Sequence, residues 1–427
     1  MNILMMTNTF SPHVGGVARS IKAFSAEYRQ RGHRVLVVAP TFDGVDPNNE
    51  SDVIRIPAIQ HFRGSDFSVA LPVPGILQPA IDKFKPDVIH SHHPFLIGGT
   101  ALRVAHTHGL PLIYTNHTKY ENYTHYLPGD SERLKRFVIS LSTNYANVCD
   151  QIFAPSDSIA TLLRERGVQT PIAVVPTGVD TKRFRRGNGM LFRKSMGIPG
   201  SAFVIGHLGR LAEEKNLEFL SKAIASFLGQ SNNNRKYCFL LIGEGPVAQK
   251  IIDYFNRLSL NDRLYVAGVL NISQIPNAYA AMDVFAFASK SETQGMVLTE
   301  AMAGGVPVVA VDASGVREVV QDGINGRLLD DDNVDSFVSA LGWMASRKNE
   351  EMQMLINGAV KTAHEFSIEK SARKALELYR QVCQRELRGR HPEYGIWTRA
   401  LHFIDSEWMI LRGVASAAGT ALGGPKR

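Results

Sequence analysis

Residues 284–311 read VFAFASKSETQGMVLTEAMAGGVPVVAV, and this stretch decides the fold. Two apolar runs of strand length, at 284–287 and 307–311, flank a polar loop and an apolar segment at 296–303. Strand–helix–strand units of this kind build parallel sheets that are covered by helices on both faces. The stretch therefore predicts a doubly wound α/β fold with a helix over 296–303.

The same alternation of short apolar runs and helix-length segments extends over most of the chain. Further helices are expected at 216–228 and 247–258. Ligands of doubly wound sheets bind beyond the carboxyl ends of the strands, so the loops there are the candidate sites. The remaining predicted strands lie at 2–7, 34–39, 87–91, 111–116, 151–154, 172–176, 203–208, 238–242 and 264–267.

The length of 427 residues indicates more than one domain, because a single hydrophobic core stops growing at about 250–300 residues. The alternation stalls in the basic stretch TGVDTKRFRRG, residues 177–187. We predict Rossmann-like domains over 1–176 and 177–367. After them we expect a helix over 368–388 that crosses back to the first domain, and an amphipathic extension over 389–427.

The extension contains two of the three tryptophans, Trp397 and Trp408, among apolar residues at helical spacing. Such a helix can pack on the protein, or it can lie at the interface with a membrane or a partner, and both alternatives stay open here. The last dozen residues are rich in Ala and Gly, so we expect them to form a loose end.

The composition describes a globular protein with a modest positive charge. Hydrophobic residues make up 44% of the chain and charged residues 20%, which excludes general disorder. The net charge of +7 lies mainly in residues 1–190, which hold twenty Lys and Arg against fifteen Asp and Glu. This excess is too small for a nucleic-acid groove, but it suits an anionic membrane surface or an anionic substrate.

The cysteines and the apolar runs predict where the protein works. The three cysteines are far apart and lack CxxC spacing, which argues against a disulfide framework and a cysteine zinc site and favours a reducing compartment. The chain starts without a basic leader, and no stretch approaches the roughly 20 apolar residues of a membrane span. We therefore expect a cytoplasmic protein whose contact with a membrane is at most peripheral.

Two glycine loops follow predicted strands. Gly15 and Gly16 open a helix, where they let the backbone approach a ligand and offer N–H groups to an anion, although a simple turn is an alternative. Residues 243–248, GEGPVA, fit the pattern G-x-G-x-x-A. The next strand does not end in the acidic residue that would hold a ribose, so this second loop argues against NAD binding.

The loop and helix of the opening stretch combine a phosphate site with two carboxylates. The backbone N–H groups of Gly295, Met296 and Val297 lie at the helix start, where they can hold phosphate. Glu300 can accept hydrogen bonds from the vicinal hydroxyls of a ribose, and Glu292 can reach a group beyond the phosphates. The alternative is a pair of solvated acids.

A third candidate loop is HLGRLAEEKN, residues 207–216, at the end of a predicted strand. The Arg210 guanidinium and the Lys215 ammonium could together neutralise a diphosphate. The alternative is a solvated helix start in which Glu213, Glu214 and Lys215 pair with one another.

Aromatic and basic residues gather at 116–141. An aromatic cluster beside a basic amphipathic helix is what docking at a membrane interface needs, while an ordinary core helix with solvated charges is the alternative. The candidate residues for an acceptor or a membrane are Tyr120, Tyr123, Tyr126, Arg133, Lys135 and Arg136.

Taken together, these motifs resemble the retaining glycosyltransferases of family 4, which have the GT-B architecture of two facing Rossmann-like domains. The resemblance covers residues 1–385. The Glu292/Glu300 pair within ETQGMVLTEAMAGGVPVV is its most specific element. The other motifs that carry it are SPHVGGVARS, YTNHT with His117, PTGVDTKRF and GRLAEEKN.

The resemblance implies a role for each candidate residue. Arg210 and Lys215 would bind the donor diphosphate, and Glu300 would bind the ribose. Glu292 would hold hydroxyls of the donor sugar, and His117 would contact that sugar near its reacting carbon. Gly16 and the backbone of Gly295–Val297 would contact the phosphates and the sugar. His117 and Glu292 are thus the expected catalytic residues.

We expect the transfer to be independent of metal ions. Asp330–Asp332 is the only string like the D-x-D motif of metal-dependent transferases, and it precedes a predicted helix, so we interpret it as a helix start. His90, His92 and His93 are too close together on a strand end to make good metal ligands. Fixed positive charge would instead stabilise the departing diphosphate, whose oxygen would deprotonate the acceptor hydroxyl on the same face of the sugar.

Within the family, residues 116–141 are most similar to bacterial diacylglycerol α-glucosyltransferases. The leading hypothesis is therefore transfer of a hexose, glucose from UDP-glucose, to 1,2-diacylglycerol at the inner face of the cell membrane. The alternatives are a polysaccharide, polyprenyl-linked or soluble glycan acceptor, a UDP-N-acetylglucosamine 2-epimerase, and a non-catalytic nucleotide-sugar-binding protein. Neither a nucleic-acid partner nor a particular oligomeric state is predicted.

Overall fold

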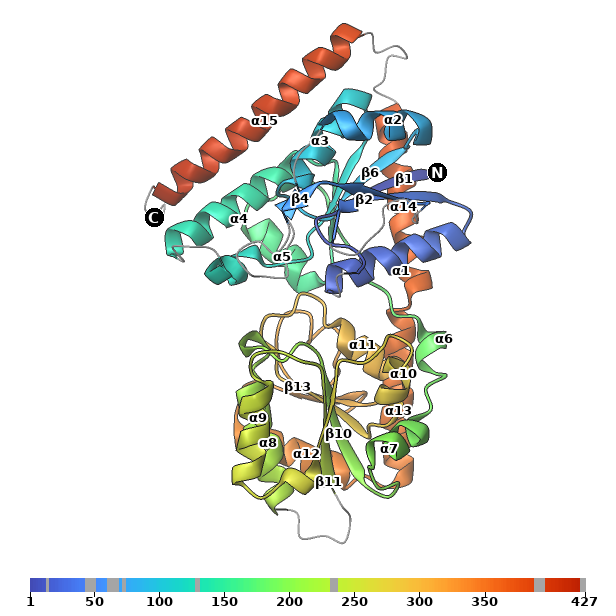
Figure 1. Cartoon of the computed structure of the whole chain (residues 1–427), viewed down its shortest axis with the longest axis vertical. Coiled ribbons are helices and arrows are strands. Elements are labelled where there is room, and N and C mark those ends of the chain that lie inside the picture. The colour runs from blue at the N-terminus through green and yellow to red at the C-terminus, as the bar shows by residue number, and fades with distance from the viewer. Residues whose placement is uncertain are drawn as a thin grey trace. The chain divides into compact units, whose positions relative to one another are not determined.

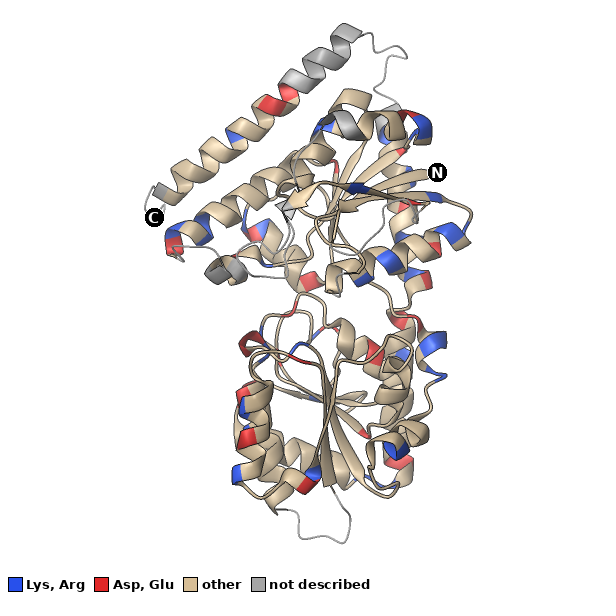
Figure 2. Cartoon of the chain, viewed as in Figure 1, with Lys and Arg blue, Asp and Glu red and all other residues tan. Residues whose placement is uncertain are grey.

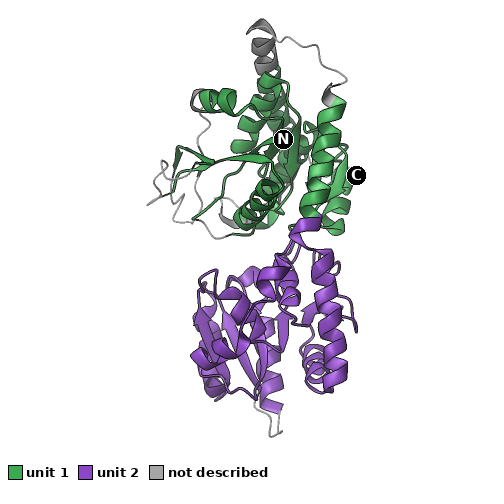
Figure 3. Ribbon diagram, turned by 90° about the vertical axis from the view of Figure 1, so that its right-hand side faces the viewer, with its two compact units in different colours: residues 1–177, 371–427 green, residues 178–370 purple. Residues whose placement is uncertain are grey.

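The computed structural model describes residues 1–12, 15–42, 51–59, 69–70, 74–126, 131–230, 237–387 and 396–422. The chain divides into two compact units. Unit 1 comprises residues 1–177 and 371–427, and unit 2 comprises residues 178–370 (Figure 3). The carboxyl-terminal part of the chain therefore returns to the unit in which the chain begins.

In the described part of unit 1, seven parallel strands form one sheet in the order β3-β2-β1-β6-β7-β8-β9 (Figure 1). The order reverses between β1 and β6, so the carboxyl ends of these two strands form the switch point where ligands of such sheets bind. The strands are β1 (Asn2–Met6), β2 (Arg34–Pro40), β3 (Val53–Ile56), β6 (Val88–Ser91), β7 (Leu112–Thr115), β8 (Gln151–Ala154) and β9 (Ile172–Val174).

The six predicted strands of unit 1 are confirmed, and three strands were missed. The edge strand β3 was missed because Arg55 interrupts its apolar run. The structure buries Arg55, whose guanidinium donates to the carbonyls of Ser11 (2.7 Å) and Pro40 (3.0 Å). The two-residue strands β4 (Ala58–Ile59) and β5 (Val69–Ala70) form a small antiparallel pair that is too short to give a pattern.

Helices cover the sheet of unit 1. In α14, Tyr379 packs on Tyr28 of α1 at a ring distance of 5.7 Å, which ties this late helix to the first one. The helices are α1 (Gly16–Gln30), α2 (Pro74–Phe84), α3 (Ile97–His108), α4 (Glu132–Asn147), α5 (Asp157–Glu165), α14 (Ile368–Leu387) and α15 (Ile396–Leu422), with a 3-10 turn η3 (Tyr120–Tyr126).

The expectation of a loose end over the last dozen residues is wrong as far as Leu422, because α15 continues to that residue. The helix packs against α3 and α4 (Figure 1). Ala417 in its last third is fully buried. Small side chains therefore permit close helix packing here rather than marking a disordered tail.

In unit 2, six described parallel strands form a sheet in the order β12-β11-β10-β13-β14-β15. The order reverses between β10 and β13, which places a second switch point there. The strands are β10 (Phe203–Leu208), β11 (Tyr237–Ile242), β12 (Leu264–Gly268), β13 (Val284–Phe287), β14 (Val308–Val311) and β15 (Gly326–Leu329).

The helices of unit 2 lie on both faces of its sheet, and alternate residues of each strand enter two different cores. Val204 and Phe285 pack into one core, and Phe203 and Ile205 pack into the other. The predicted helix over 296–303 is confirmed as α11. The helices are α6 (Thr181–Phe184), α7 (Gly189–Met196), α8 (Leu217–Gln230), α9 (Ala248–Arg257), α10 (Ile275–Ala280), α11 (Met296–Ala303), α12 (Val334–Ala345) and α13 (Asn349–Glu365), with 3-10 turns η4 (Glu213–Lys215) and η5 (Asn261–Arg263).

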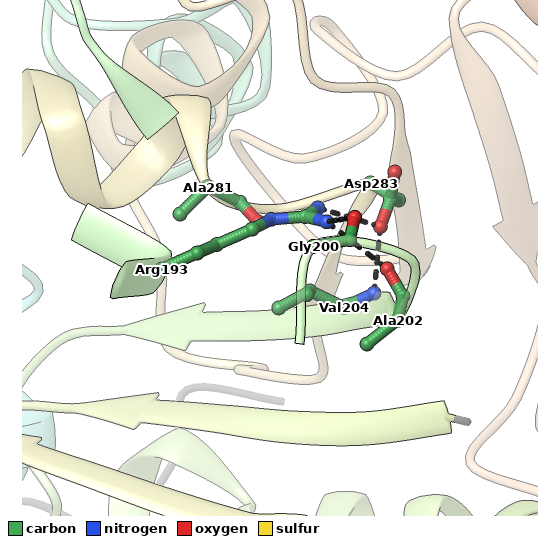
Figure 4. Close-up of polar contacts among 6 residues, drawn as sticks. All are labelled: Arg193, Gly200, Ala202, Val204, Ala281 and Asp283. Atoms are coloured by element: carbon green, nitrogen blue, oxygen red, sulfur yellow. Dashed lines mark hydrogen bonds and ion pairs between the residues drawn. The ribbon is translucent and has the colours of Figure 1, made fainter. Parts of the chain in front are cut away.

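An ion pair between the buried Arg193 and the half-buried Asp283 joins α7 to the amino ends of β10 and β13 (Figure 4). Arg193 donates through Nη2 to Asp283 Oδ2 (2.9 Å). Its Nε donates to the carbonyl of Ala281 (2.8 Å), and its Nη1 donates to the carbonyls of Gly200 (3.2 Å) and Ala202 (3.0 Å). The same Asp283 oxygen accepts the Val204 N–H at 2.7 Å. Nε and Nη1 of the guanidinium therefore hold backbone carbonyls, and Nη2 holds the Asp283 carboxylate.

Candidate active site

The three candidate loops of unit 2 meet at the carboxyl ends of β10, β11 and β13. Their backbones pack so closely that glycine is required. A Cβ on Gly243, where φ is +126°, would lie 1.9 Å from the carbonyl oxygen of Gly209. The N–H of Leu211 donates to the carbonyl of Glu244 at 2.9 Å. The loop GEGPVA thus supports the loop that carries Arg210.

Lys215 and Glu292 form an ion pair across the switch point. The Lys215 ammonium donates to Glu292 Oε1 at 2.5 Å, and the two side chains are 23% and 16% exposed. Lys215 therefore has a partner outside the set Glu213, Glu214 and Lys215 that the alternative interpretation proposed. Glu213 instead lies 3.7 Å from Lys250. The loops after β10 and β13 thus bring together the cation and the carboxylate that the sequence placed 77 residues apart.

His207, which the sequence analysis did not single out, lies buried beside this pair on β10. Its Nδ1 lies 3.0 Å from the carbonyl oxygen of Ala286. Its Nε2 is buried and has no hydrogen-bond partner among the described residues. Burial lowers the pKa of His207 to about 4, with the charge of Lys215 acting in the same direction and Glu292 against it. The ring is therefore neutral at pH 7, with the proton on Nδ1.

The amino end of α11 is shaped by two glycines. Gly295 caps the helix with φ +72°, and a Cβ there would lie 2.9 Å from the carbonyl oxygen of Gly315. A Cβ on Gly315 would lie 2.5 Å from the backbone nitrogen of Gln294. No side chain caps α11, and its first turn has no acidic residue. The N–H groups of Met296 and Val297 therefore lie at a positive helix end that suits an anion.

Glu300 lies in the second turn of α11, and its side chain is held by a buried tyrosine. The residue is only 7% exposed, and its Oε2 accepts a hydrogen bond from the Tyr279 hydroxyl at 3.0 Å. Tyr279 is fully buried on α10. Nothing in the segment 275–280 distinguishes this tyrosine from a core aromatic residue, so its role could not be predicted from the sequence.

Arg210 differs from Lys215 and Glu300, whose side chains are each held by a partner in unit 2. Its side chain is exposed, and it makes no ion pair within the part of unit 2 that the structure describes. Lys215 lies five positions further along the same loop. The switch point of unit 2 therefore presents one cation that is held by Glu292 and one that extends into solvent.

In unit 1, Gly15 and Gly16 lie at the start of α1, as predicted. Gly15 is the extended N-cap residue and has no side chain to cap the helix. A Cβ on Gly16 would meet no atom within 4 Å, so packing does not demand a glycine there. The first turn of α1 is therefore open to a ligand within the described structure.

His117 follows β7 and is held by a second histidine. Its Nε2 lies 2.9 Å from His92 Nδ1, and the two rings stack with their centres 5.2 Å apart. Burial lowers the pKa of His117 to about 4. His92 Nε2 is buried without a partner among the described residues, which favours a proton on His92 Nδ1 that is donated to His117. His117 would then carry its own proton on Nδ1.

The histidines of HSHHPF have polar partners in the fold of unit 1. His90 lies 2.5 Å from the Tyr379 hydroxyl and 2.7 Å from Thr115 Oγ1. His93 Nδ1 accepts the N–H of Asn8 at 3.1 Å. Among the described residues, no group of three or more His, Cys, Asp or Glu side chains could hold a metal ion.

The Asp330–Asp332 string precedes a helix, as predicted, because Asn333 is the N-cap of α12. Asp332 accepts hydrogen bonds from Lys290 Nζ (2.7 Å) and Asn216 Nδ2 (3.2 Å). The bond from Lys290 lowers the pKa of Asp332 below its ordinary value.

The candidate acceptor residues do not share one environment. The Tyr120 ring packs on Phe95 at 4.9 Å, and its hydroxyl is buried, which raises its pKa. The side chains of Tyr123 and Tyr126 lie outside the described residues. Arg133 is exposed near the amino end of α4, where Figure 2 shows a group of charged residues.

The other two basic candidates on α4 are engaged. Lys135 donates to Glu132 at 2.9 Å. Arg136 Nη2 donates to the carbonyl of Ala421 at 3.4 Å, close to the end of α15. A cation at this place suits the negative end of a helix dipole, so Arg136 has a structural partner that the sequence did not indicate.

Two Rossmann-like sheets with helices at the carboxyl end of the chain define the GT-B fold of glycosyltransferases. The family model described as Glycosyltransferase Family 4 matches residues 14–183, and that described as Glycosyl transferases group 1 matches residues 191–362. The chain belongs to glycosyltransferase family 4, the family of retaining hexosyltransferases that the motifs resemble.

Three relatives illustrate the range of this family. Alpha-monoglucosyldiacylglycerol synthase of Streptococcus pneumoniae is 28% identical over 340 residues, which cover 77% of this chain and 75% of that protein. D-inositol 3-phosphate glycosyltransferase of Saccharomonospora viridis is 30% identical over 306 residues, covering 69% and 70%. The crystal structure of Anabaena Alr3699/HepE in complex with UDP-glucose has the same fold, with a TM-score of 0.69, 20% identity and coverage of 89% of this chain and 99% of that one.

Proposed function

We propose that this glycosyltransferase moves glucose from UDP-glucose to 1,2-diacylglycerol with retention of configuration. The observation that carries the proposal is the Lys215–Glu292 pair at the switch point of unit 2, three residues before the uncapped end of α11. A cation, a carboxylate and a helix amino end together match the diphosphate and the hydroxyls of a nucleotide-sugar.

The enzyme must stabilise the negative charge that develops on the leaving group. When the bond between the sugar carbon and the phosphate oxygen breaks, negative charge grows on the diphosphate. Lys215, Arg210 and the N–H groups of Met296 and Val297 are the positive groups available for it in unit 2. As the diphosphate attracts the Lys215 ammonium, the Glu292 carboxylate becomes available to accept hydrogen bonds from sugar hydroxyls.

The acceptor hydroxyl forms a new bond to the same carbon on the face that the phosphate leaves. Its proton passes to the departing phosphate oxygen, so charge and atoms balance without a covalent enzyme intermediate. Glu300 keeps its predicted role at the ribose, with Tyr279 fixing the carboxylate. His117 and the glycines at 15 and 16 keep their predicted roles at the donor sugar.

Two lines of support favour a lipid acceptor. The chain resembles a diacylglycerol glucosyltransferase over three quarters of that protein's length, and unit 1 combines aromatic residues with the basic α4. Among the described helices none is long and apolar enough to cross a bilayer. We infer peripheral attachment to the inner face of the cell membrane, where diacylglycerol would be reached.

A soluble acceptor is the second candidate, because the relative from Saccharomonospora viridis is named for inositol 3-phosphate. The test is incubation of the purified chain with radiolabelled UDP-glucose and either diacylglycerol vesicles or D-inositol 3-phosphate. We expect label in the organic phase with the vesicles and none in the aqueous product. Label confined to water-soluble products would overturn the lipid acceptor, and a Glu292→Gln variant serves as the inactive control.

A further inference from the structure

The helix α15 lies outside both matched family segments, and its inner face is firmly attached to unit 1. Ser406 and Ala417 on this face are fully buried. Met409 and Ile410 pack against the hydrophobic core of unit 1. Since Ser406 and Ala417 are eleven residues apart, about three helical turns, one continuous stripe of α15 faces the body of the unit.

Polar contacts fix the rotation of α15 on its neighbours. Arg103 of α3 binds the Glu407 carboxylate through two nitrogens, with Nη2 donating to Oε2 at 3.2 Å. Asn144 of α4 donates to the carbonyl of Gly413 at 3.0 Å. Together with the contact of Arg136 to Ala421, these bonds determine which side chains of the helix point outward.

The outward face of α15 carries three large exposed apolar side chains, with Asp405, Arg412 and Ser416 as exposed polar residues among them. Trp408, Leu411 and Val414 are 59%, 60% and 42% exposed, and Ala415 and Arg412 are exposed beside them. Residues 408, 411 and 415 recur at the spacing of one helix face. Among the described residues of unit 1, Leu96 is the one other large hydrophobic side chain exposed to this degree. An apolar stripe of this kind on an otherwise well-packed unit marks an interaction surface.

The charge distribution indicates what kind of surface would receive this stripe. Unit 1 contains twenty-six Lys and Arg against nineteen Asp and Glu, whereas unit 2 contains twenty-one of each. Unit 1 therefore carries the whole net charge of +7. Arg412 is an exposed cation within the stripe, and Arg133 is an exposed cation of α4, the helix on which α15 packs.

We propose that the outward face of α15 docks on an anionic lipid bilayer, with the helix lying in the plane of the membrane. Trp408, Leu411 and Val414 enter the boundary between headgroups and acyl chains, and Arg412 stays among the headgroups. The proposal deepens the proposed function, because it rests on a lipid acceptor for its biological purpose. Vesicle binding without donor or acceptor is nevertheless measured independently of transfer.

A bilayer fits this stripe better than a second protein does. A stable protein interface buries about 800 Å² on each partner and needs a complementary shape. Three large side chains along one helix cover less area than such an interface. A fluid bilayer can accept a narrow apolar stripe without a complementary shape. Tryptophan is also the side chain that favours the membrane–water boundary.

The first test measures sedimentation of the full chain with vesicles of phosphatidylcholine alone or mixed with phosphatidylglycerol. We expect binding to the mixed vesicles, weakened about tenfold or more in a Trp408→Ser/Leu411→Ser variant. The matched control is Met190→Ser/Met354→Ser, which removes side chains of unit 2 that are 64% and 72% exposed. Equal binding by the α15 variant and the wild type would overturn the proposal.

A second measurement does not depend on removing the stripe. A Trp343→Phe/Trp397→Phe variant leaves Trp408 as the single tryptophan. Its fluorescence should shift to shorter wavelength on anionic vesicles and be quenched by brominated acyl chains. Fluorescence that stays unquenched while the protein is bound would overturn the assignment of this face.

Transfer assays separate this inference from the proposed function. The Trp408→Ser/Leu411→Ser variant should lose transfer to diacylglycerol in vesicles but keep transfer to a short-chain diacylglycerol in solution. Equal transfer to vesicles by variant and wild type would defeat the docking surface alone. Self-association in the absence of lipid that disappears in the variant would also overturn it, in favour of a second copy of the chain.

Discussion

Two ion pairs of unit 2 lie at opposite ends of the same two strands, and their surroundings differ. Arg193–Asp283 lies at the amino ends of β10 and β13, where four backbone groups surround the two side chains (Figure 4). Lys215–Glu292 lies at the carboxyl ends, beside the exposed Arg210 and the uncapped end of α11. A pair whose other hydrogen bonds all go to backbone groups stabilises the fold. A pair that lies beside an exposed cation and an uncapped helix end can instead be rearranged by a ligand.

Replacing Glu292 by Gln should have the largest effect on the candidate active site at the carboxyl ends of β10 and β13. The change removes the charge that holds Lys215 and that would accept sugar hydroxyls, so we expect kcat/KM to fall by about 10³-fold or more. Thermal stability should change little, because both side chains reach solvent. Steady-state kinetics and calorimetry measure the two effects. Glu213→Gln, in the same loop, is the control and should stay within twofold of the wild type.

Replacing Arg193 by Met should produce the opposite result. It leaves the half-buried Asp283 carboxylate without its cation and several carbonyls without donors, which costs about 3 kcal/mol in the free energy of unfolding. The activity per folded molecule should be unchanged. Urea denaturation followed by assay of the folded fraction tests this, with Arg317→Met in the exposed Arg317–Asp312 pair as a control that costs about 1 kcal/mol or less. Loss of turnover in folded Arg193→Met protein would refute the division of roles.

Lowering the pH should reduce the stability of the fold through His207, at the carboxyl end of β10. Its pKa falls from 6.5 to about 4 on folding, so the unfolded chain binds more protons between these values. Stability contributed by the neutral ring is thus complete above pH 6.5 and is lost by about 1.4 kcal/mol per pH unit as the pH falls toward 4. A His207→Leu variant should lack this part of the slope. Parallel slopes for wild type and variant in denaturation between pH 7 and 5 would contradict the expectation.

Replacing Tyr279 by Phe should have the smallest effect. It removes one hydrogen bond to Glu300, worth about 1 kcal/mol, so KM for the donor should rise about fivefold with little change in kcat. Initial rates at varied UDP-glucose measure this. Tyr265→Phe, on β12 of the same unit, is the control. A loss of kcat with unchanged KM would show that the Tyr279 hydroxyl serves the chemical step instead.

Much of the fold could be predicted because parallel sheets produce local apolar runs. The eleven predicted strands all exist, and α11 begins and ends where the sequence indicated. The strands that were missed are short or interrupted by charge: β4 and β5 have two residues each, and β3 contains Arg55 within its apolar run. Burial of Arg55 becomes evident only from the carbonyls that it binds.

The site was predictable in its residue types but not in its pairing. Strand ends and a helix start located Lys215 and Glu292, yet the sequence could not tell that they bind each other rather than near neighbours. The contacts of Tyr279 with Glu300 and of His92 with His117 were missed because each joins residues more than twenty positions apart. Such contacts depend on the order of strands in the sheet, which no local pattern specifies.

The mutual packing of Gly295 and Gly315 also has a consequence for protein engineering. Because a methyl group at either position would collide with the backbone of the other loop, a mutant library meant to alter donor choice should leave both positions unchanged. Diversity is better introduced at Ser291 and Thr293, whose side chains flank Glu292 and are half-buried. New sugar preferences can then be selected without reshaping the turn that presents them.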